Sequence, residues 1–345
     1  MARADRESVD VVLDAAELSP SRAIGTLRFS ASRSDLSPSF EYDAAWLAER
    51  GAFSIDPRLE LYPGEQHPPS TALTFGILQD ASPDRWGRTL MERREGLSAR
   101  KEGRKVRRFG EIDFLLGVHD LSRSGALRFR SQTTGNYLHD STELAAPPAN
   151  SLRELAHVSR KLEEPGADDS PEFERWLSML VAPGTSLGGA RPKASFLESN
   201  KQLWLGKFPS REDRYDIGAW EVVVHELARK AKVEVPRARL EKLTARYGTF
   251  CVERFDRNKE HRRMFASAMT LLDRRDGANA SYLDIAQLIA DQGASKHVEE
   301  DLAHSSVGWS STYWYRIETI TCATTAFSAP LLAGGSLPPS TSTRI

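Results

Sequence analysis

Apolar and polar residues alternate along short stretches in the first third of the chain. Residues 9–13 and 25–29 both place apolar side chains at every second position, and polar turn residues separate the two stretches. A period of two is typical of β-strands that bury one face. The pattern therefore predicts a β-rich unit at the N-terminus.

The pattern changes near residue 148. A short segment rich in Ala and Pro, residues 145–150, resembles a linker, and the residues after it space their apolar side chains three and four apart. This spacing predicts helices over residues 151–162 and 172–180. We therefore expect a domain boundary near residue 148.

A different order of elements follows residue 184, and it is typical of proteins that bind nucleotides. A glycine-rich turn precedes a predicted strand, and helices and one more strand come after it. The predicted elements are a strand over 202–208, a helix over 217–232, a strand over 249–253, and helices over 265–272 and 281–289.

The composition narrows the class of protein. The 345 residues suffice for about two domains, and 40% of them are hydrophobic, so a real core can be buried. The net charge of −1 gives no overall basic field, so a role at DNA would need a partner.

Two cysteines in the whole sequence favour a reducing compartment, and we expect a cytoplasmic protein. No apolar run approaches the roughly 20 residues of a membrane span, so we expect no membrane association.

The strongest local signal lies in residues 184–193, Gly-Thr-Ser-Leu-Gly-Gly-Ala-Arg-Pro-Lys. Glycines let the backbone approach a ligand and direct successive amides at phosphate oxygens, and Arg191 and Lys193 add cationic donors. The segment is not a Walker loop, because Gly-Lys-Ser/Thr is missing. A glycine-rich hairpin turn is an equal alternative on composition alone.

Lys207 ends the strand predicted over 202–208, on the side of the strand that is otherwise apolar. In kinase-like folds a strand lysine holds ATP phosphates and is steadied by a glutamate on a helix, and the helix that follows offers Glu221 or Glu226. The alternative is a lysine that simply extends its charge to water.

Residues 250–257 pass from an apolar strand into charge, as expected of a hinge strand that offers backbone groups to an adenine ring. Glu253 and Asp256 could equally form an exposed pair bridged by the neighbouring arginines. A basic run over residues 93–108 contains glutamates and is more typical of a solvated helix face than of a phosphate-binding patch.

Together these segments resemble the HipA family of serine/threonine kinases, the toxin components of bacterial type II toxin–antitoxin pairs. The resemblance runs from about residue 9 to about residue 302. It includes Ser-Pro-Asp-Arg-Trp-Gly-Arg at residues 82–88 and Ser-Gly-Ala-Leu-Arg-Phe at residues 124–129, besides the segments described above.

This resemblance implies that the protein binds ATP with Mg²⁺, phosphorylates a protein such as an aminoacyl-tRNA synthetase or another translation factor, and autophosphorylates at Ser186. It also implies a helix-turn-helix antitoxin similar to HipB, through which any contact with DNA would be indirect. The residues expected to bind the nucleotide are Gly188, Gly189, Arg191, Lys193, Lys207, Glu253, Phe255 and Asp256.

The catalytic half of such a kinase is not in frame. Phosphoryl transfer needs an acidic residue that orients the nucleophile and another that holds magnesium, and in the family they lie in motifs resembling Asn-Arg-Asp-Asp-His and Phe-Asp-Val-Asn-Pro. From residue 305 onward the chain is instead rich in Ser, Thr, Pro and Gly, with Glu318 as its only acid.

The genetic code offers an explanation for this change. When the last base of each codon is read with the first two bases of the next, residues 316–328 can encode Asn-Arg-Asp-Asp-His-Leu-Arg-Asn-His-Gly-Phe-Leu. Residues 337–344 can likewise encode Pro-Ala-Phe-Asp-Val-Asn-Pro. We therefore hypothesise a one-nucleotide slip between about residues 302 and 307, and expect no catalytic residue and no metal ligand in frame.

The predicted fold class is α+β: a HipA-like kinase with a β-rich N-terminal unit, a mixed α/β ATP-binding lobe and a truncated helical C-terminal lobe. The expected segments are 1–148, 149–260, 261–304 and an aberrant tail over 305–345. The helices over 265–272 and 281–289 are expected to lose much of their packing partner, which predicts marginal stability.

Two functions follow from this interpretation. The first is a HipA-like kinase by descent that does not transfer phosphate as written. The alternative is a catalytically silent module that binds the antitoxin through its N-terminal unit and modulates repression.

Overall fold

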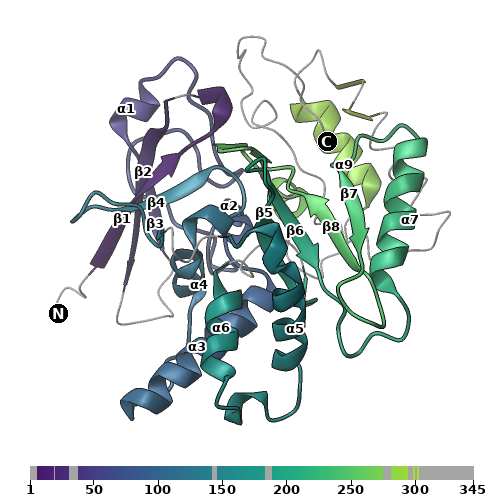
Figure 1. Cartoon of the computed structure of the whole chain (residues 1–345). Coiled ribbons are helices and arrows are strands. Elements are labelled where there is room, and N and C mark those ends of the chain that lie inside the picture. The colour runs from purple at the N-terminus through teal and green to yellow at the C-terminus, as the bar shows by residue number, and fades with distance from the viewer. Residues whose placement is uncertain are drawn as a thin grey trace.

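A computed structural model of the chain describes residues 6–18, 20–30, 38–141, 146–182, 189–274, 281–293, 298–299 and 301–302. Within these ranges, helices pack around two four-stranded antiparallel sheets. Figure 1 shows the two sheets side by side. The predicted α+β fold class is therefore confirmed.

The first sheet has the strand order β3-β2-β1-β4. In its central pair Val9 lies opposite Leu27 in antiparallel register, and both side chains are buried. The alternation of apolar residues correctly predicted these two strands. The strands are β1 (Arg6–Leu13), β2 (Arg22–Ser30), β3 (Ser39–Tyr42) and β4 (Leu127–Ser131).

The N-terminal unit is less β-rich than its pattern predicted, because helices occupy much of residues 76–117. The 18-residue α3 is capped at both ends: Asp84 accepts a hydrogen bond from Gly87 N, and Gly103 adopts the left-handed conformation that commonly ends a helix. The helices are α1 (Ala44–Leu47), α2 (Gly76–Asp80), α3 (Arg85–Glu102) and α4 (Glu111–Gly117).

The second sheet has the strand order β5-β6-β8-β7 and carries the predicted nucleotide-binding segments. The elements α5, α6, β6, α7 and β8 agree closely with the predicted ones, whereas the strands β5 and β7 were not predicted. In Figure 1 α7 lies along β7 and β8 while α5 and α6 lie beside β5 and β6. The elements are α5 (Leu152–Leu162), α6 (Phe173–Val181), β5 (Lys193–Leu197), β6 (Leu203–Lys207), α7 (Ile217–Lys230), β7 (Ala238–Glu241) and β8 (Thr249–Glu253).

Two hydrophobic cores hold these layers together, and both cross the predicted boundary at residue 148. One core lies at the first sheet, and the other joins α5, α6 and the second sheet. Trp86 and Leu90 of α3 belong to the second core. The N-terminal unit therefore packs directly against the lobe with the predicted nucleotide site.

The segment after the second sheet forms a short hairpin, β9 (Arg257–Asn258) and β10 (His261–Arg262), and then the helices α8 (Ala268–Leu271) and α9 (Tyr282–Gln292). Leu271, Ile285 and Ile289 are buried in the first core. The expectation that these helices lose their packing partner is wrong, because the N-terminal unit supplies one.

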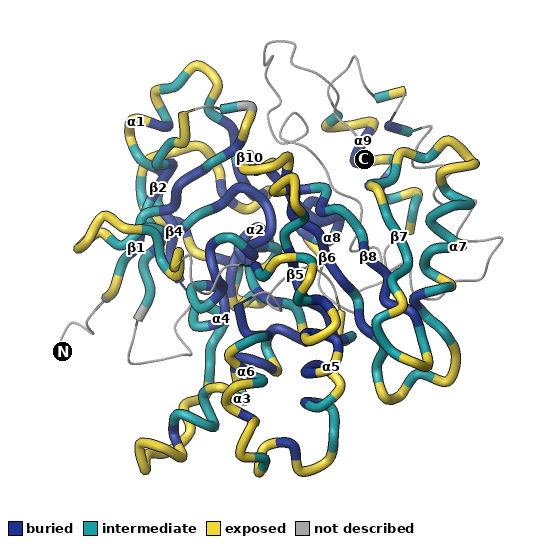
Figure 2. The backbone as a smooth tube through the Cα atoms, viewed as in Figure 1, coloured by how far each residue is buried: buried dark blue, intermediate teal, exposed yellow. Residues whose placement is uncertain are grey.

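Exposed apolar side chains occur on both α9, where Leu283 is 80% exposed, and α7. Gly218 is the only buried residue of this helix, and Trp220 and Val223 are 59% and 47% exposed. Figure 2 shows α7 and the neighbouring β7 as mostly intermediate or exposed, whereas most of β8 is buried. The predicted tail over 305–345 and both signatures of the alternative frame lie outside the described residues.

Candidate nucleotide-binding site

An ion pair joins the end of β6 to α7. Lys207 Nζ lies 2.5 Å from Glu221 Oε2, and the two side chains are 30% and 26% exposed. The ammonium also lies 5.3 Å from the centre of the Phe250 ring, close enough for a cation–π interaction. Of the two glutamates that the sequence offered, the structure selects Glu221. Glu226 instead pairs with Arg229 on the exposed part of the helix.

The position of Glu221 follows from the close packing of the first turn of α7. A Cβ on Gly218 would lie 2.3 Å from Gly248 O, so only glycine fits here. Asp216 caps the helix by accepting from Ala219 N at 3.0 Å and also accepts from Gly248 N at 3.0 Å. These contacts hold the start of α7 against the turn before β8 and bring Glu221 next to β6.

Lys193 lies opposite Lys207 across the β5–β6 pair. Its side chain is 1% exposed, and Lys193 Nζ lies 2.5 Å from Asp84 Oδ2. Burial lowers the pKa of Lys193, and the charge of Asp84 opposes this effect. Burial likewise raises the pKa of Asp84, against the charge of Lys193. Lys193 is therefore a buried cation that already has an anionic partner, and its contact with phosphate stays a prediction.

The other residues predicted in the glycine-rich segment are only partly described. Gly189 has a φ of +100°, a conformation that glycine adopts readily. Arg191 forms a bidentate ion pair with Asp213, so its guanidinium already has an anionic partner. Ser186 and Gly188 lie outside the described residues, and their roles stay predictions.

The predicted hinge lies at the end of β8. Glu253 Oε2 accepts a hydrogen bond from Arg237 Nε at 2.6 Å, and the Phe255 ring packs against Phe265 with ring centres 5.3 Å apart. Both residues are partly exposed, and their role at an adenine ring stays a prediction. Asp256 is fully buried, so neither the nucleotide contact nor the exposed pair predicted for it describes its position.

Asp256 instead belongs to a buried network of arginines and aspartates that joins the two halves of the chain. Arg254 binds both of its carboxylate oxygens at 2.8 and 2.6 Å, Arg257 adds a third contact, and Gly125 N donates at 2.9 Å. The hydrogen bond from Gly125 joins the segment at residues 124–129 to this network.

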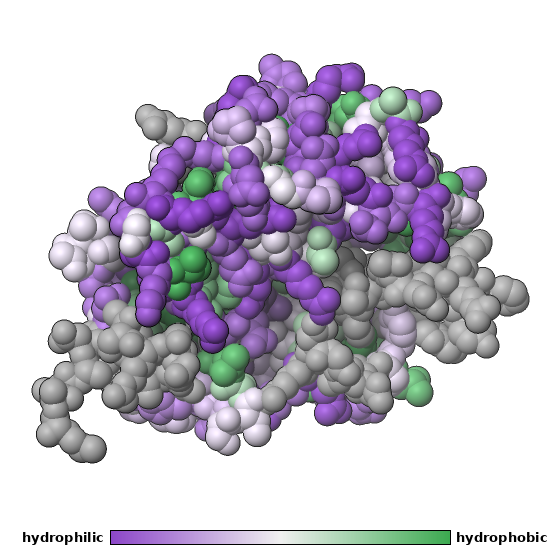
Figure 3. All heavy atoms as spheres, turned by 90° about the horizontal axis from the view of Figure 1, so that it is seen from below, coloured by the Kyte–Doolittle hydropathy of each residue, from purple (hydrophilic) through white to green (hydrophobic). Residues whose placement is uncertain are grey.

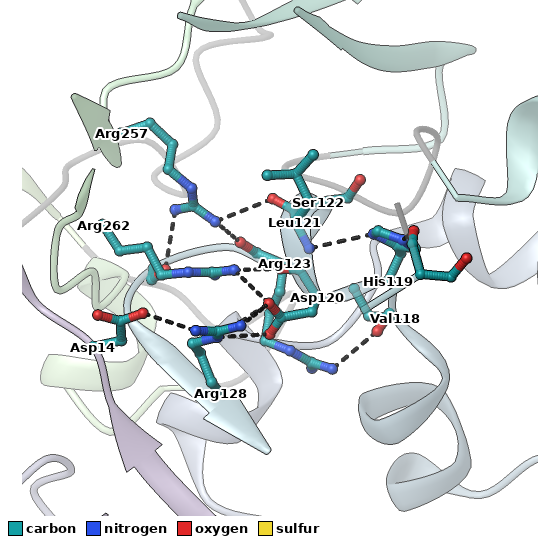
Figure 4. Close-up of polar contacts among 12 residues, drawn as sticks. Asp14, Val118, His119, Asp120, Leu121, Ser122, Arg123, Arg128, Arg257 and Arg262 are labelled. Carbon is teal, nitrogen blue, oxygen red and sulfur yellow. Dashed lines mark hydrogen bonds and ion pairs between the residues drawn. The ribbon is translucent and has the colours of Figure 1, made fainter. Parts of the chain in front are cut away.

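A second part of the network surrounds Asp120, as Figure 4 shows. Arg128 and Arg262 both bind its carboxylate, and Arg257 donates to backbone carbonyls of the same turn. The sequence did not predict that Asp120, Arg123 and Arg262 belong to the network that joins the two halves of the chain. Single charged residues between apolar segments carry no local signal of burial.

Ion pairs also account for much of the basic run over 93–108. Arg104 pairs with Glu95 and Glu102, Arg107 pairs with Asp113, and Lys101 pairs with Glu174. This arrangement agrees with the solvated helix face that the interrupting glutamates indicated.

The described residues offer few further candidates for a binding site. Figure 3 shows a largely hydrophilic face with small, separated apolar patches. Within the described ranges no group of three or more His, Cys, Asp or Glu residues could hold a metal ion. A search of the same residues finds no helix that is both long and apolar enough to span a membrane.

Comparison with known proteins places this fold in a family. The sequence profile of the HipA N-terminal domain matches residues 18–112, and that of the HipA-like C-terminal domain matches residues 185–306. The fold is similar to a chain in the complex of HipA, HipB and operator DNA from the Shewanella oneidensis MR-1 toxin–antitoxin system, with a TM-score of 0.53 and 18% sequence identity. The similarity covers 85% of this chain and 67% of that one. The comparison with curated proteins finds no match.

The fold and the two profile matches define an α+β protein with a HipA-type N-terminal domain and a HipA-like C-terminal domain. The chain belongs to the HipA family.

Proposed function

We propose that this protein is a HipA-type toxin whose second lobe binds ATP through Lys207 and Glu221, and that it does not transfer phosphate as written. The observation that supports ATP binding is the ion pair between these two residues, 2.5 Å long and partly exposed at the end of β6. The proposed loss of the transfer step rests on the sequence after the hinge, where neither catalytic signature of the family is in frame.

The site residues fit a triphosphate in charge and placement. Bound ATP would supply the γ-phosphoryl group, and Lys207 would neutralise phosphate oxygens while Glu221 keeps the ammonium oriented. The Phe250 ring supports the lysine from below its ammonium. The described residues offer no set of magnesium ligands, so we derive no role for the metal from them. A protein substrate such as an aminoacyl-tRNA synthetase stays part of the proposal.

Replacing Lys207 with Met tests ATP binding. Hydrogen bonds to charged groups contribute about 1.5–3 kcal/mol, so we expect ATP affinity to fall about tenfold to a hundredfold. The measurement is isothermal titration of the full chain with ATP. Lys201→Met is the matched control, because Lys201 precedes the same strand, is 76% exposed and pairs only with Glu260 in the described contacts. Equal affinities of K207M and the unmodified chain would contradict the proposed site.

The partner that the family comparison supports is a HipB-like antitoxin, since the similar solved structure contains HipA, HipB and operator DNA. We propose that this chain retains antitoxin binding through its N-terminal unit. The observation in favour is that this unit is packed and continuous, with its core built from β1–β4 and the helices α2 and α4.

Co-purification with a HipB-like helix-turn-helix protein tests the partner. We expect a stable complex from co-expression, detected by size-exclusion chromatography, and its binding should be insensitive to Lys207→Met. If the two proteins elute separately at micromolar concentration, the antitoxin-binding function is wrong for this chain.

A further inference from the structure

The segment at residues 82–88 contacts the start of β5 at several points. Lys193 Nζ lies 2.5 Å from Asp84 Oδ2 and donates to Gly189 O at 2.9 Å. Trp86 N donates to Gly189 O at 3.3 Å, and its indole Nε1 donates to Lys193 O at 3.1 Å. Two residues of the N-terminal unit therefore hold Gly189 and Lys193 together.

Because the Asp84–Lys193 ion pair is buried, losing either partner is costly in stability. The side chains of Asp84 and Lys193 are 8% and 1% exposed, and a buried charge that loses its partner is strongly destabilised. Asp84 is also the N-cap of α3 and accepts from Gly87 N at 2.9 Å with its other oxygen. One carboxylate thus fixes both the start of a long helix and the start of β5.

The same connection reaches the proposed ATP site. Lys193 lies opposite Lys207 across the β5–β6 pair, and Gly189 is the last glycine of the glycine-rich segment. A shift at the start of β5 would therefore move the end of this segment relative to the lysine that is proposed to bind phosphate.

We propose that Asp84 is a positioning residue for ATP, which acts through Lys193 and Gly189 to hold the end of the glycine-rich segment beside Lys207. This inference rests on the proposed ATP-binding function. Asp84 itself does not touch the nucleotide; it sets the position of the backbone that would. The conspicuous Ser-Pro-Asp-Arg-Trp-Gly-Arg segment then has a role in the other half of the protein.

The test compares ATP affinity among variants of the full chain by isothermal titration. Asp84→Asn keeps the size and the helix cap but removes the charge, and Lys193→Met removes the other partner. We expect each to weaken ATP binding about tenfold. The double variant should lose about as much ATP affinity as either single variant, because both act through one contact.

Arg88→Gln is the matched control. Arg88 lies one turn further along α3 and forms a bidentate ion pair with Glu111, away from β5. We expect R88Q to lower the thermal midpoint less than D84N does, because the Arg88–Glu111 pair is more exposed, while ATP affinity stays within about twofold. A folded D84N chain with unchanged affinity, or additive losses in the double variant, would overturn the proposal. If D84N does not fold, the double variant takes its place, and unchanged affinity in it has the same meaning.

A second measurement does not depend on ATP. Hydrogen exchange without nucleotide should be faster over residues 189–197 in D84N than in the unmodified chain, and unchanged there in R88Q. Unchanged exchange in D84N would contradict the positioning role. Faster exchange in D84N, together with no ATP binding by the unmodified chain, would support the connection and reject the proposed function.

Discussion

Restoring the second reading frame between codons 302 and 307 is expected to turn an inactive chain into a kinase that labels itself with radioactive ATP. The restored frame would supply the two acidic signatures that the printed sequence lacks. A positioned general base alone contributes about 10²- to 10⁴-fold to a proton-transfer step, and the metal ligand would be regained with it. We therefore expect incorporation to rise by about 10³-fold or more.

The controls separate self-labelling from contamination. In the restored chain Ser186→Ala should abolish the label, and Lys207→Met should reduce it strongly. Label on the printed chain that disappears with Ser186→Ala would show that the printed chain is active and that the out-of-frame explanation is wrong. A read of the genomic nucleotides at the junction provides an independent check, because one added or removed base must rejoin the two frames.

Replacing Asp256 with Asn is expected to cause the largest loss of stability among the substitutions considered. The change leaves Arg254 and Arg257 buried without their shared carboxylate. Breaking a buried pair by removing one partner costs about 3–5 kcal/mol, a large part of the total stability of an ordinary protein of about 5–15 kcal/mol. The measurement is the urea midpoint of unfolding, followed by circular dichroism.

The matched control for this prediction is Glu226→Gln, since Glu226 forms a solvent-exposed pair with Arg229 on α7. Exposed pairs contribute little, so its midpoint should stay that of the unmodified chain. A D256N chain that is as stable as the E226Q chain would show that the buried network does not hold the two halves together.

The same carboxylate should make stability depend on acid. Burial alone would raise the pKa of Asp256, but the charges of Arg254 and Arg257 outweigh it and hold the pKa well below its ordinary value of 3.8. A carboxyl with a lowered pKa in the folded state stabilises the protein above the ordinary pKa, and this contribution is lost as pH falls through the folded value. Below pH 3.8 the stability of D256N should therefore fall less steeply than that of the unmodified chain.

Local patterns were enough to predict the elements that carry the candidate site. The strand over 249–253 has the predicted bounds, and β6 and α7 differ from their predicted ranges by no more than two residues at either end. The pairing of Lys207 with a helical glutamate was also expected, although spacing left two glutamates open. The choice fell to Glu221 because Gly218 packs against Gly248 and turns the start of the helix toward β6.

Other features depend on contacts that no local pattern reveals. Asp84 and Lys193 are 109 residues apart in sequence, and Arg262 reaches Asp120 across 142 residues. Each of these side chains looks like an ordinary surface charge in its own segment. The expected loss of packing at α8 and α9 was wrong for the same reason, since the partner of both helices lies in the N-terminal unit.

By itself, the sequence determined the fold class and most of the strands and helices around the candidate site, and it predicts that the catalytic signatures lie out of frame. These properties are set by hydrophobic period, turn residues and motif order, which act over a few neighbouring positions. Only the tertiary structure decided which charges are buried and with which partner. It placed Lys193 and Asp256 in buried ion pairs, because burial and pairing depend on residues brought together from distant parts of the chain.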